Sequence, residues 1–364
     1  MNQVIVDLGT RSYPIRIGTG LLAQTGAFLR EQGLTGRVVV ITNPTVAQWY
    51  VSPVAQALRE AGYDPQVLEL PDGESYKSLR EAERVYDFLV DGKYDRKTVL
   101  IALGGGVIGD LTGFVAATYM RGVRFVQIPT TLLAQVDSSV GGKVAVNHSK
   151  GKNLIGAFYQ PQLVITDVAT LDTLPDAEFS SGMAEVIKHG IILDPEYYRL
   201  VMDQLPALCR REHQSLAEVV AGSCRIKAAV VKADETEANL RAILNFGHTI
   251  GHALESVTHF THYKHGEGVA LGMLAATRIA DRIGLFPDAA NLEADLARFG
   301  AALSLPTTIP QLNVAELFDA IYLDKKVELG AIRWVLPEAI GKATITTDVP
   351  KAVVVDILQR MGGS

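Results

Sequence analysis

The segment Val99-Leu-Ile-Ala-Leu-Gly-Gly-Gly-Val-Ile-Gly109 decides the fold class expected for this chain of 364 residues. An unbroken apolar run that leads into a glycine-rich turn is typical of a strand buried on both faces and followed by a helix. The same order of β-branched run, turn and helical period recurs between residues 38 and 167. Strands are predicted at 38–42, 67–70, 99–103 and 125–128, and helices at 46–61, at 77–90, from near Gly109 onward, and briefly after Pro129. The sequence therefore predicts an α/β domain with a parallel sheet covered by helices on both faces.

The alternation ends at Leu174-Pro175, which suggests a domain boundary near residues 173–176. Residues 4–8 and 13–17 are expected to form a hairpin at one edge of the sheet. Beyond the boundary helical periodicity dominates, with long stretches at 216–233 and 240–256, and only 332–336 and 343–347 favour strands. We therefore predict a Rossmann-like parallel-sheet domain over residues 1–174 and a mainly α-helical domain over residues 175–364.

The charge balance excludes some classes of partner. The 34 Lys+Arg against 40 Asp+Glu give a net charge of -6, so there is no overall basic field for nucleic acid or an anionic membrane surface. A small anionic ligand is still compatible, because a pocket responds to its own charges. The most apolar window, 99–120, contains Asp110 and five glycines, which favour a strand, a turn and a buried helix over a membrane span.

The first residues and the two cysteines favour a cytoplasmic protein. Residues 1–8 contain no basic region leading into an apolar run, so we expect no secretory signal. Cys209 and Cys224 lie apart on helical stretches, without the spacing of metal ligands. They are expected to be reduced, buried thiols.

Three loops at predicted strand ends favour a dinucleotide site. Gly104-Gly-Gly-Val-Ile-Gly109 has the spacing G-x-G-x-x-G, in which glycines let a pyrophosphate approach a helix N-terminus. The usual acidic residue some twenty positions later is missing, so a simple tight turn between strand and helix is the alternative. The segments 71–77, with Glu74 and Lys77, and 129–131, with two threonines, follow neighbouring strands. Because the carboxyl ends of parallel strands meet at one edge, the three loops together favour the dinucleotide site.

Five of the eight histidines fall within residues 248–265. In Asn245-Phe-Gly-His-Thr-Ile-Gly-His252 the spacing places His248 and His252 on one helix face, as in many metal sites, although Thr249 stands where H-E-x-x-H has its glutamate. His265, in a turn before the next helix, could complete a metal or catalytic site. His213, His259 and His262 are expected to be structural.

A carboxylate ligand could come from Glu185, which lies among apolar residues with Lys188 one helical turn away and His189 at i+4. A buried carboxylate needs a metal or a cation, whereas a surface ion pair with Lys188 is the alternative. Further cations occur in apolar or glycine-rich settings, where they either are solvated or converge on phosphate and carboxylate groups. These are Arg121, Lys143, Lys152, Lys227, Arg241 and Lys342.

Over nearly its whole length the chain resembles the 3-dehydroquinate synthase family of the sugar-phosphate cyclases. The resemblance is carried by long ungapped motifs at residues 71–78, 104–122, 127–143, 151–158, 182–188 and 245–252. Departures are small: Val144 stands where many members have Thr, and Ser149-Lys150 where Pro is common. The resemblance implies one divalent metal, zinc or cobalt, held by Glu185, His248 and His265, which leaves His189 a structural role.

The resemblance also implies NAD and a phosphorylated sugar acid as ligands. The NAD contacts it implies are Asn43, Asp72, Glu74, Lys77, Gly105, Gly106, Val107, Gly109, Asp110, Thr130, Thr131, Lys143, Lys152, Thr170, Leu171 and Thr173. The catalytic residues it implies are Asp137, Lys143, Lys188, Arg241, Asn245 and His252, with Arg121, Asn153, Lys227 and Lys342 binding the substrate. A cytoplasmic homodimer whose domains close on the ligands is expected.

The reaction implied is conversion of 3-deoxy-D-arabino-heptulosonate 7-phosphate to 3-dehydroquinate, with transient oxidation by NAD, loss of phosphate, re-reduction and intramolecular aldol closure. The metal would act as a Lewis acid and the cations would neutralise carboxylate and phosphate. The substrate's own phosphate is a candidate for taking the proton. Three alternatives are another sugar-phosphate cyclase, a metal-dependent polyol dehydrogenase, and a binding module without turnover.

Overall fold

The computed structural model describes residues 1–237, 240–258, 261–309, 313–325 and 332–362. The chain forms two compact units: Met1–Leu174 with Leu216–Thr236, and Pro175–Ser215 with Glu237–Ser364. The first break follows Leu174, at the predicted boundary. Residues 216–236 were predicted to belong to the second domain, but in the structure they belong to the first unit. The cause is packing of helix α8 (His213–Ala233), whose buried Cys224 donates from Sγ to the Gln135 carbonyl at 3.3 Å.

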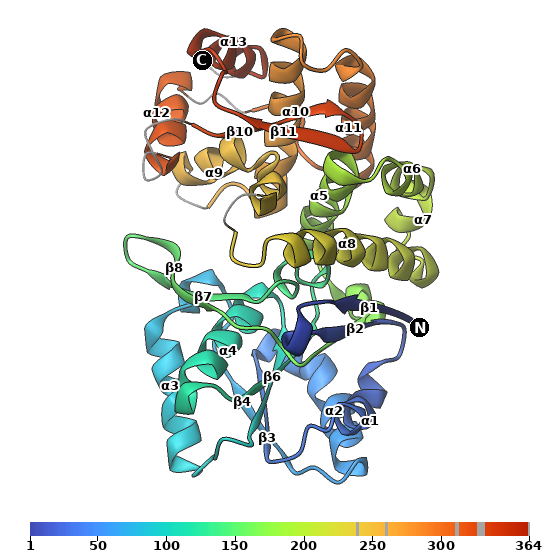
Figure 1. Cartoon of the computed structure of the whole chain (residues 1–364), viewed down its shortest axis with the longest axis vertical. Helices are drawn as coiled ribbons and strands as arrows, with labels where there is room; N and C mark the ends of the chain where they lie inside the picture. The colour runs from blue at the N-terminus through green and yellow to red at the C-terminus, as the bar shows by residue number, and fades with distance from the viewer. Residues whose placement is uncertain (238–239, 259–260, 310–312, 326–331, 363–364) are drawn as a thin grey trace. The chain divides into compact units, whose positions relative to one another are not determined.

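The first unit contains the predicted parallel sheet with a hairpin at one edge (Figure 1). Its seven strands lie in the order β1-β2-β9-β6-β5-β3-β4, and only β1 and β2 pair antiparallel. The strands are β1 (Asn2–Val6), β2 (Tyr13–Gly18), β3 (Val38–Thr42), β4 (Pro65–Glu69), β5 (Val99–Gly104), β6 (Arg124–Pro129) and β9 (Leu163–Asp167). The edge hairpin and the four predicted parallel strands are confirmed.

Strand β5 consists of the unbroken apolar run 99–103 and Gly104, and its side chains are buried on both faces of the sheet. Its Leu100 and Ala102 belong to one core cluster, whereas Val99, Ile101 and Leu103 belong to the other. Successive side chains of a strand point to opposite faces, so each face of the sheet has its own core. Helices α3 and α4 pack in the first cluster, and α1 and α2 in the second. Their bounds are α1 (Thr25–Glu31), α2 (Pro44–Glu60), α3 (Leu79–Asp91) and α4 (Gly106–Thr118).

The segment 99–120 forms the strand, turn and buried helix that the sequence predicts, although α4 begins at Gly106 rather than near Gly109. The helix starts immediately after the strand end, so the glycines form its N-terminus. Among the described residues, no helix is both long and apolar enough to cross a membrane.

A second hairpin in the first unit, β7 (Lys143–His148) with β8 (Gly151–Phe158), was not predicted. Many of its side chains on β8 are exposed, so the alternation of polar and apolar residues that marks a half-buried strand is weak there. The stretch after Pro129 forms a short π-type helix over Ala134–Ser138. The hairpin carries Lys143, Lys152 and Asn153.

The second unit is mainly helical, as predicted, with one antiparallel hairpin of β10 (Trp334–Ala339) and β11 (Lys342–Thr346). Its helices are α5 (Asp176–Leu193), α6 (Pro195–Asp203), α7 (Leu205–Cys209), α9 (His248–Val257), α10 (His265–Arg282), α11 (Ala289–Leu303), α12 (Val314–Lys325) and α13 (Lys351–Arg360).

The helix predicted over 240–256 is broken. A 3-10 helix over Leu240–Asn245 ends before α9, and Gly247 between them has φ +82°. A Cβ at Gly247 would lie 2.7 Å from the Val269 carbonyl oxygen. The break therefore needs glycine for both conformation and space.

The two cysteines are free, but only Cys224 is buried. Cys209 is exposed, contrary to the prediction, because it is the last residue of the short helix α7, where Arg210 and Arg211 follow.

Candidate functional site

The second unit brings Glu185, His248 and His265 together. Glu185 Oε1 lies 3.7 Å from His248 Nε2 and 3.6 Å from His265 Nε2. One ligand atom from each of the three residues lies within 4.8 Å of the other two. Ligand atoms about 3.5 Å apart are those expected around a zinc ion bound at 2.0–2.2 Å. This group can hold one divalent metal ion.

Close helix packing places these side chains. Glu185 lies in α5, and His248 and His265 are the first residues of α9 and α10. Gly266 lets α10 approach α5, because a Cβ there would lie 2.0 Å from the Ser181 carbonyl oxygen. The Gly266 N–H also donates to Ser181 Oγ at 2.9 Å. The start of α10 is therefore fixed one helical turn from Glu185.

The other ring nitrogen of each histidine has a fixed partner. His265 Nδ1 lies 3.0 Å from Glu255 Oε1, and His248 Nδ1 lies 3.2 Å from the Phe246 carbonyl oxygen. With Nδ1 held as a donor, each Nε2 is the nitrogen that faces Glu185, and a metal ion bound between them would take the place of any proton on Nε2, as in metal sites supported by a carboxylate. Sequence reasoning missed Glu255, although its spacing of seven residues from His248 on one helix face was a usable signal.

The electrostatics of this group are uneven. Burial alone raises the pKa of Glu185, but Lys188, with which it forms an ion pair, and the two histidines hold that pKa well below its usual value. Burial and the nearby Lys188 lower the pKa of His248 well below its usual value. For His265 burial also acts to lower the pKa, but Glu185 and Glu255 raise it to about 10. Glu185 and Lys188 do form an ion pair, but both side chains are buried in α5. The alternative of an ion pair on the surface is therefore wrong.

The structure places most residues predicted to contact NAD in loops at the carboxyl ends of the parallel strands. Asn43 and Asp72 follow β3 and β4, and are joined by a hydrogen bond from Asn43 Nδ2 to Asp72 Oδ1 at 2.9 Å. Gly105 follows β5 and is the N-cap of α4. Thr130 follows β6, and its N–H donates to the Gly104 carbonyl at 3.0 Å. Thr170, Leu171 and Thr173 follow β9, and Glu74, Lys77, Gly106, Val107, Gly109, Asp110 and Thr131 lie in or beside these loops.

Lys77 is the best-buried cation of this edge, with 4% of its surface exposed. Its Nζ donates to Asp110 Oδ2 and to Asn153 Oδ1, each at 2.5 Å. Burial raises the pKa of Asp110, and the ammonium of Lys77 opposes that shift. One lysine thus links a loop after β4, the first helical turns of α4 and the β7–β8 hairpin.

The residues predicted to bind substrate fall in both units. In the first, Lys227 Nζ lies 2.5 Å from Asp137 Oδ1, and Arg121 is exposed with φ +69°. Lys143 and Asn153 belong to the β7–β8 hairpin, as does Lys152, which was predicted to contact NAD. In the second, Lys188 and Arg241 are buried, and the ring centroid of His252 lies 5.2 Å from that of His248. Asn245 ends the 3-10 helix before α9, and Lys342 is 71% exposed and pairs with Glu338 at 2.6 Å.

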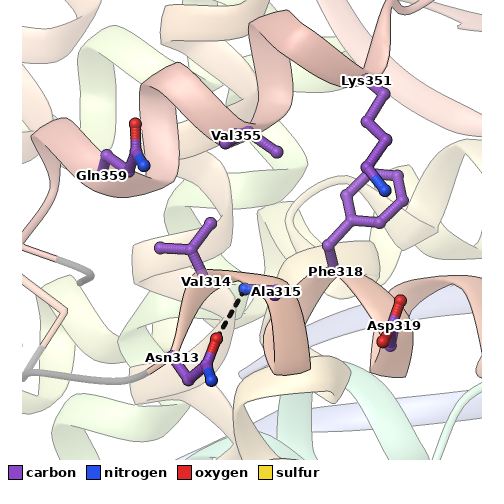
Figure 2. A pocket seen from close by; sticks show the side chains of 8 residues that line it. All are labelled: Asn313, Val314, Ala315, Phe318, Asp319, Lys351, Val355 and Gln359. Atoms are coloured by element: carbon purple, nitrogen blue, oxygen red, sulfur yellow. Dashed lines mark hydrogen bonds between the residues drawn. The ribbon is translucent and has the colours of Figure 1, made fainter.

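Several features lie outside this set. His189 is buried in α5, His213 begins α8, His262 is exposed, and His259 lies outside the described residues. A pocket of about 260 Å³ lies between α12 and α13, and Figure 2 shows the side chains that line it. In it, Lys351 Nζ lies 4.3 Å from the centre of the Phe318 ring. None of the residues predicted to bind metal, NAD or substrate lines it.

Comparisons with known proteins give one consistent result. The profile of the 3-dehydroquinate synthase N-terminal domain matches residues 67–181, and the C-terminal profile of the same family matches residues 182–327. The 3-dehydroquinate synthase of Desulforamulus reducens is 48% identical over 361 residues, 99% of this chain and 100% of that protein. That of Geotalea uraniireducens is 48% identical over 347 residues, 95% of this chain and 96% of that protein.

Solved structures with the same fold are more distant in sequence. A 2-deoxy-scyllo-inosose synthase with carbaglucose-6-phosphate, NAD+ and Co2+ has a TM-score of 0.89 at 24% identity, covering 99% of this chain and 100% of that one. The 2-epi-5-epi-valiolone synthase of Streptomyces hygroscopicus, with NAD+ and Zn2+ bound, has a TM-score of 0.87 at 24% identity, covering 96% of each chain. These likenesses confirm the predicted fold class.

Proposed function

The chain belongs to the 3-dehydroquinate synthase family, and on this premise we propose that Glu185, His248 and His265 hold its catalytic divalent metal, zinc or cobalt. As a member of that family it is an enzyme, a lyase that forms 3-dehydroquinate. The observation that carries the metal assignment is the orientation of the two histidines. Each has its Nδ1 held, by Glu255 or by the Phe246 carbonyl, so that its Nε2 faces Glu185 Oε1.

The donor set fits a metal on a second ground. Glu185 has none of its surface exposed, and its Oε1 accepts no hydrogen bond from any residue that the structure describes. Lys188 pairs with the other oxygen, Oε2, so Oε1 is the atom left without a partner among the described residues, and a buried oxygen of this kind is costly unless a cation lies beside it. Two imidazole nitrogens and one carboxylate oxygen are the ligands of many catalytic zinc sites, which leave a further position open.

We assign NAD binding to the loops at the carboxyl ends of the parallel strands in residues 1–174, and metal and substrate binding mainly to residues 175–364. Supporting the first assignment, α4 begins directly after β5, so its backbone N–H groups and positive helix end face an incoming pyrophosphate. Glu74 is exposed and offers carboxylate oxygens to ribose hydroxyls. The NAD contacts expected from the sequence all belong to this unit.

The proposed chemistry divides between the bound groups and the chain's own residues. When bound, the metal supplies Lewis acidity and NAD a hydride acceptor that is restored, so that 3-deoxy-D-arabino-heptulosonate 7-phosphate yields 3-dehydroquinate and phosphate without net oxidation. Lys188 offsets the charge of Glu185, and Lys227 holds the Asp137 carboxylate. Lys143, Arg121 and Lys342 provide charge for the substrate's phosphate and carboxylate, and Arg241, Asn245 and His252 orient its hydroxyls.

Release of phosphate tests this function. Purified protein with NAD and zinc or cobalt is expected to release one phosphate per molecule of heptulosonate phosphate, without lasting NADH absorbance, because the hydride is returned. Continuous NADH accumulation would instead identify a polyol dehydrogenase. Phosphate release only from a different sugar phosphate would identify another cyclase, and no turnover of any of these would leave a binding module.

Replacing Glu255 by glutamine is expected to weaken metal binding by roughly 10–100-fold, because the neutral amide no longer stabilises a proton on His265 Nδ1. Competition with a coloured chelator measures the metal affinity directly. Glu267→Gln is the matched control, since it makes the same chemical change in α10, the helix that His265 begins. Glu267 Oε2 accepts from the Lys264 N–H at 2.8 Å and so caps that helix instead of holding His265. Equal metal affinity of Glu255→Gln and wild type would contradict the proposed support of His265.

The family resemblance leads us to propose a cytoplasmic homodimer as the working form. Two free cysteines, one of them buried, agree with a reducing compartment. Light scattering of the purified protein measures the oligomeric state, and a monomer at working concentration would exclude the dimer.

A further inference from the structure

The side chain of Asn147 ties the β7–β8 hairpin to the loop that precedes α3. Its amide oxygen accepts a hydrogen bond from the backbone N–H of Asn153 at 2.8 Å. Its amide nitrogen donates to Glu74 Oε1 at 2.8 Å and approaches the Glu74 carbonyl at 3.4 Å. Because the N–H needs an acceptor and the carboxylate a donor, only one orientation of the amide satisfies both. Asn147 thus joins a residue proposed to bind NAD to one proposed to bind substrate, while belonging to neither set.

A bulge in the hairpin explains how Asn147 reaches this position. The antiparallel ladder pairs Val146 with Ile155 and then His148 with Gly151, so its register shifts at Asn147. The N–H of Asn147 donates instead to the Lys77 carbonyl at 2.8 Å, and Asn147 forms an isolated parallel bridge with Ser78. Bulges of this kind redirect a side chain out of the regular alternation. Here the redirected side chain points to Glu74.

Asn153 is held in a conformation that few residues adopt. Its φ is +57°, in the left-handed region that asparagine tolerates better than most residues. Asn147 holds its backbone N–H, and Lys77 Nζ holds its Oδ1 at 2.5 Å. Two independent anchors therefore fix the side chain and the backbone of one proposed substrate ligand.

We infer that Asn147 is a positioning residue that sets Glu74 and Asn153 relative to one another, so that both NAD affinity and substrate affinity depend on it. This inference rests on the proposed function, in which Glu74 contacts NAD and Asn153 contacts the substrate. The two hydrogen bonds leave from different atoms of one amide, Nδ2 and Oδ1. The two dependences can therefore be separated by substitution.

Asn147→Asp keeps an oxygen that accepts from the Asn153 N–H but places a carboxylate against Glu74. We expect the Kd for NAD, measured by calorimetry on metal-loaded protein without substrate, to rise roughly tenfold or more, because a donor to a charged group is lost. The KM for the phosphorylated sugar acid is expected to change by less than about threefold. Asn147→Ala removes both hydrogen bonds and is expected to raise both the Kd and the KM.

Glu74→Gln provides a test that general loss of structure does not mimic. Alone, it is expected to weaken NAD binding, because a neutral amide oxygen accepts less strongly from a ribose hydroxyl. Combined with Asn147→Asp, it is expected to strengthen NAD binding relative to Asn147→Asp alone, because the new amide nitrogen donates to the new carboxylate. Glu74→Gln is thus expected to weaken NAD binding when residue 147 is asparagine and to strengthen it when residue 147 is aspartate.

Ser149→Asp is the control, because it adds a carboxylate to the same exposed hairpin end and is expected to leave both constants unchanged. Equal Kd values for NAD in the wild type and Asn147→Asp would overturn the inference. Glu74→Ala then separates the two failures. If Glu74→Ala raises the Kd for NAD, only the positioning role of Asn147 is wrong, and if it does not, the proposed NAD contact of Glu74 is wrong as well.

Discussion

Replacing His265 with alanine is expected to strip the metal and to lower turnover by roughly 1000-fold or more, because a site with two remaining protein ligands loses its Lewis acid. His265 is the one ligand of the three that contacts both Glu185 and Glu255. The Kd for NAD is expected to change by less than about twofold, because the residues proposed to bind NAD belong to the other unit. Elemental analysis after dialysis, calorimetry with NAD and the phosphate-release assay measure the three quantities.

His262→Ala is the matched control, since His262 is exposed three residues earlier and contacts Tyr263 rather than any metal ligand. It is expected to keep its metal and its turnover. Full turnover of His265→Ala with metal bound would remove His265 from the site. Loss of NAD affinity in His265→Ala would show instead that the two binding events are coupled.

Lys77→Met is expected to lower the free energy of unfolding by roughly 3 kcal/mol, because it leaves the largely buried carboxylate of Asp110 without its cation. The side chain of Lys77 is 5% exposed and that of Asp110 is 17% exposed, so water replaces the lost contact poorly. The substitution also removes the donor to Asn153 Oδ1. Urea denaturation of the protein without ligands measures the loss separately from any effect on NAD binding.

The loss of unfolding free energy in Lys77→Met is expected to depend on pH, which tests its proposed cause. Burial already raises the pKa of Asp110, and removing the ammonium raises it further. The uncompensated charge disappears when Asp110 is protonated, so the deficit in unfolding free energy is expected to be larger at pH 8 than at about pH 5. Lys232→Met, which breaks an exposed pair with Asp7 at 2.7 Å, is the control and is expected to change stability little. Similar losses in the two variants would show that burial of the Lys77 pair is unimportant.

The parallel sheet could be predicted because its pattern is local. Strand β5 sends successive side chains to two cores, so every position had to be apolar, and a glycine-rich turn marked its end. A metal site could also be proposed, since Glu185 in an apolar helix and the spacing of His248 and His252 are unusual. The choice of His265 rather than His252 as the third ligand came from the family resemblance. The break at Gly247 was missed because helical periodicity continues on both sides of it, although that glycine was the available signal.

Other features depend on contacts between distant segments and leave little trace in the sequence. The spacing of Glu255 from His248 placed it on the metal-binding face of α9, but its contact with His265 depends on how α9 and α10 pack, which the sequence does not show. The β7–β8 hairpin has a bulge at Asn147 and an exposed strand, so the period of two is disturbed where it would have been recognised. Cys209 is exposed because a short helix ends there, which hydrophobic periodicity does not reveal.

The return of residues 216–236 to the first unit has a consequence for biosynthesis. Until residues 216–236 have been translated, Asp137 lacks Lys227 and Arg11 lacks its two contacts to Glu235 at 2.8 and 2.7 Å. On the ribosome, the first unit can therefore be completed only after residue 236 has left the exit tunnel, when residues 175–215 have emerged as well. A fragment ending at Leu174 should accordingly behave as a folding intermediate rather than as an autonomous cofactor-binding domain.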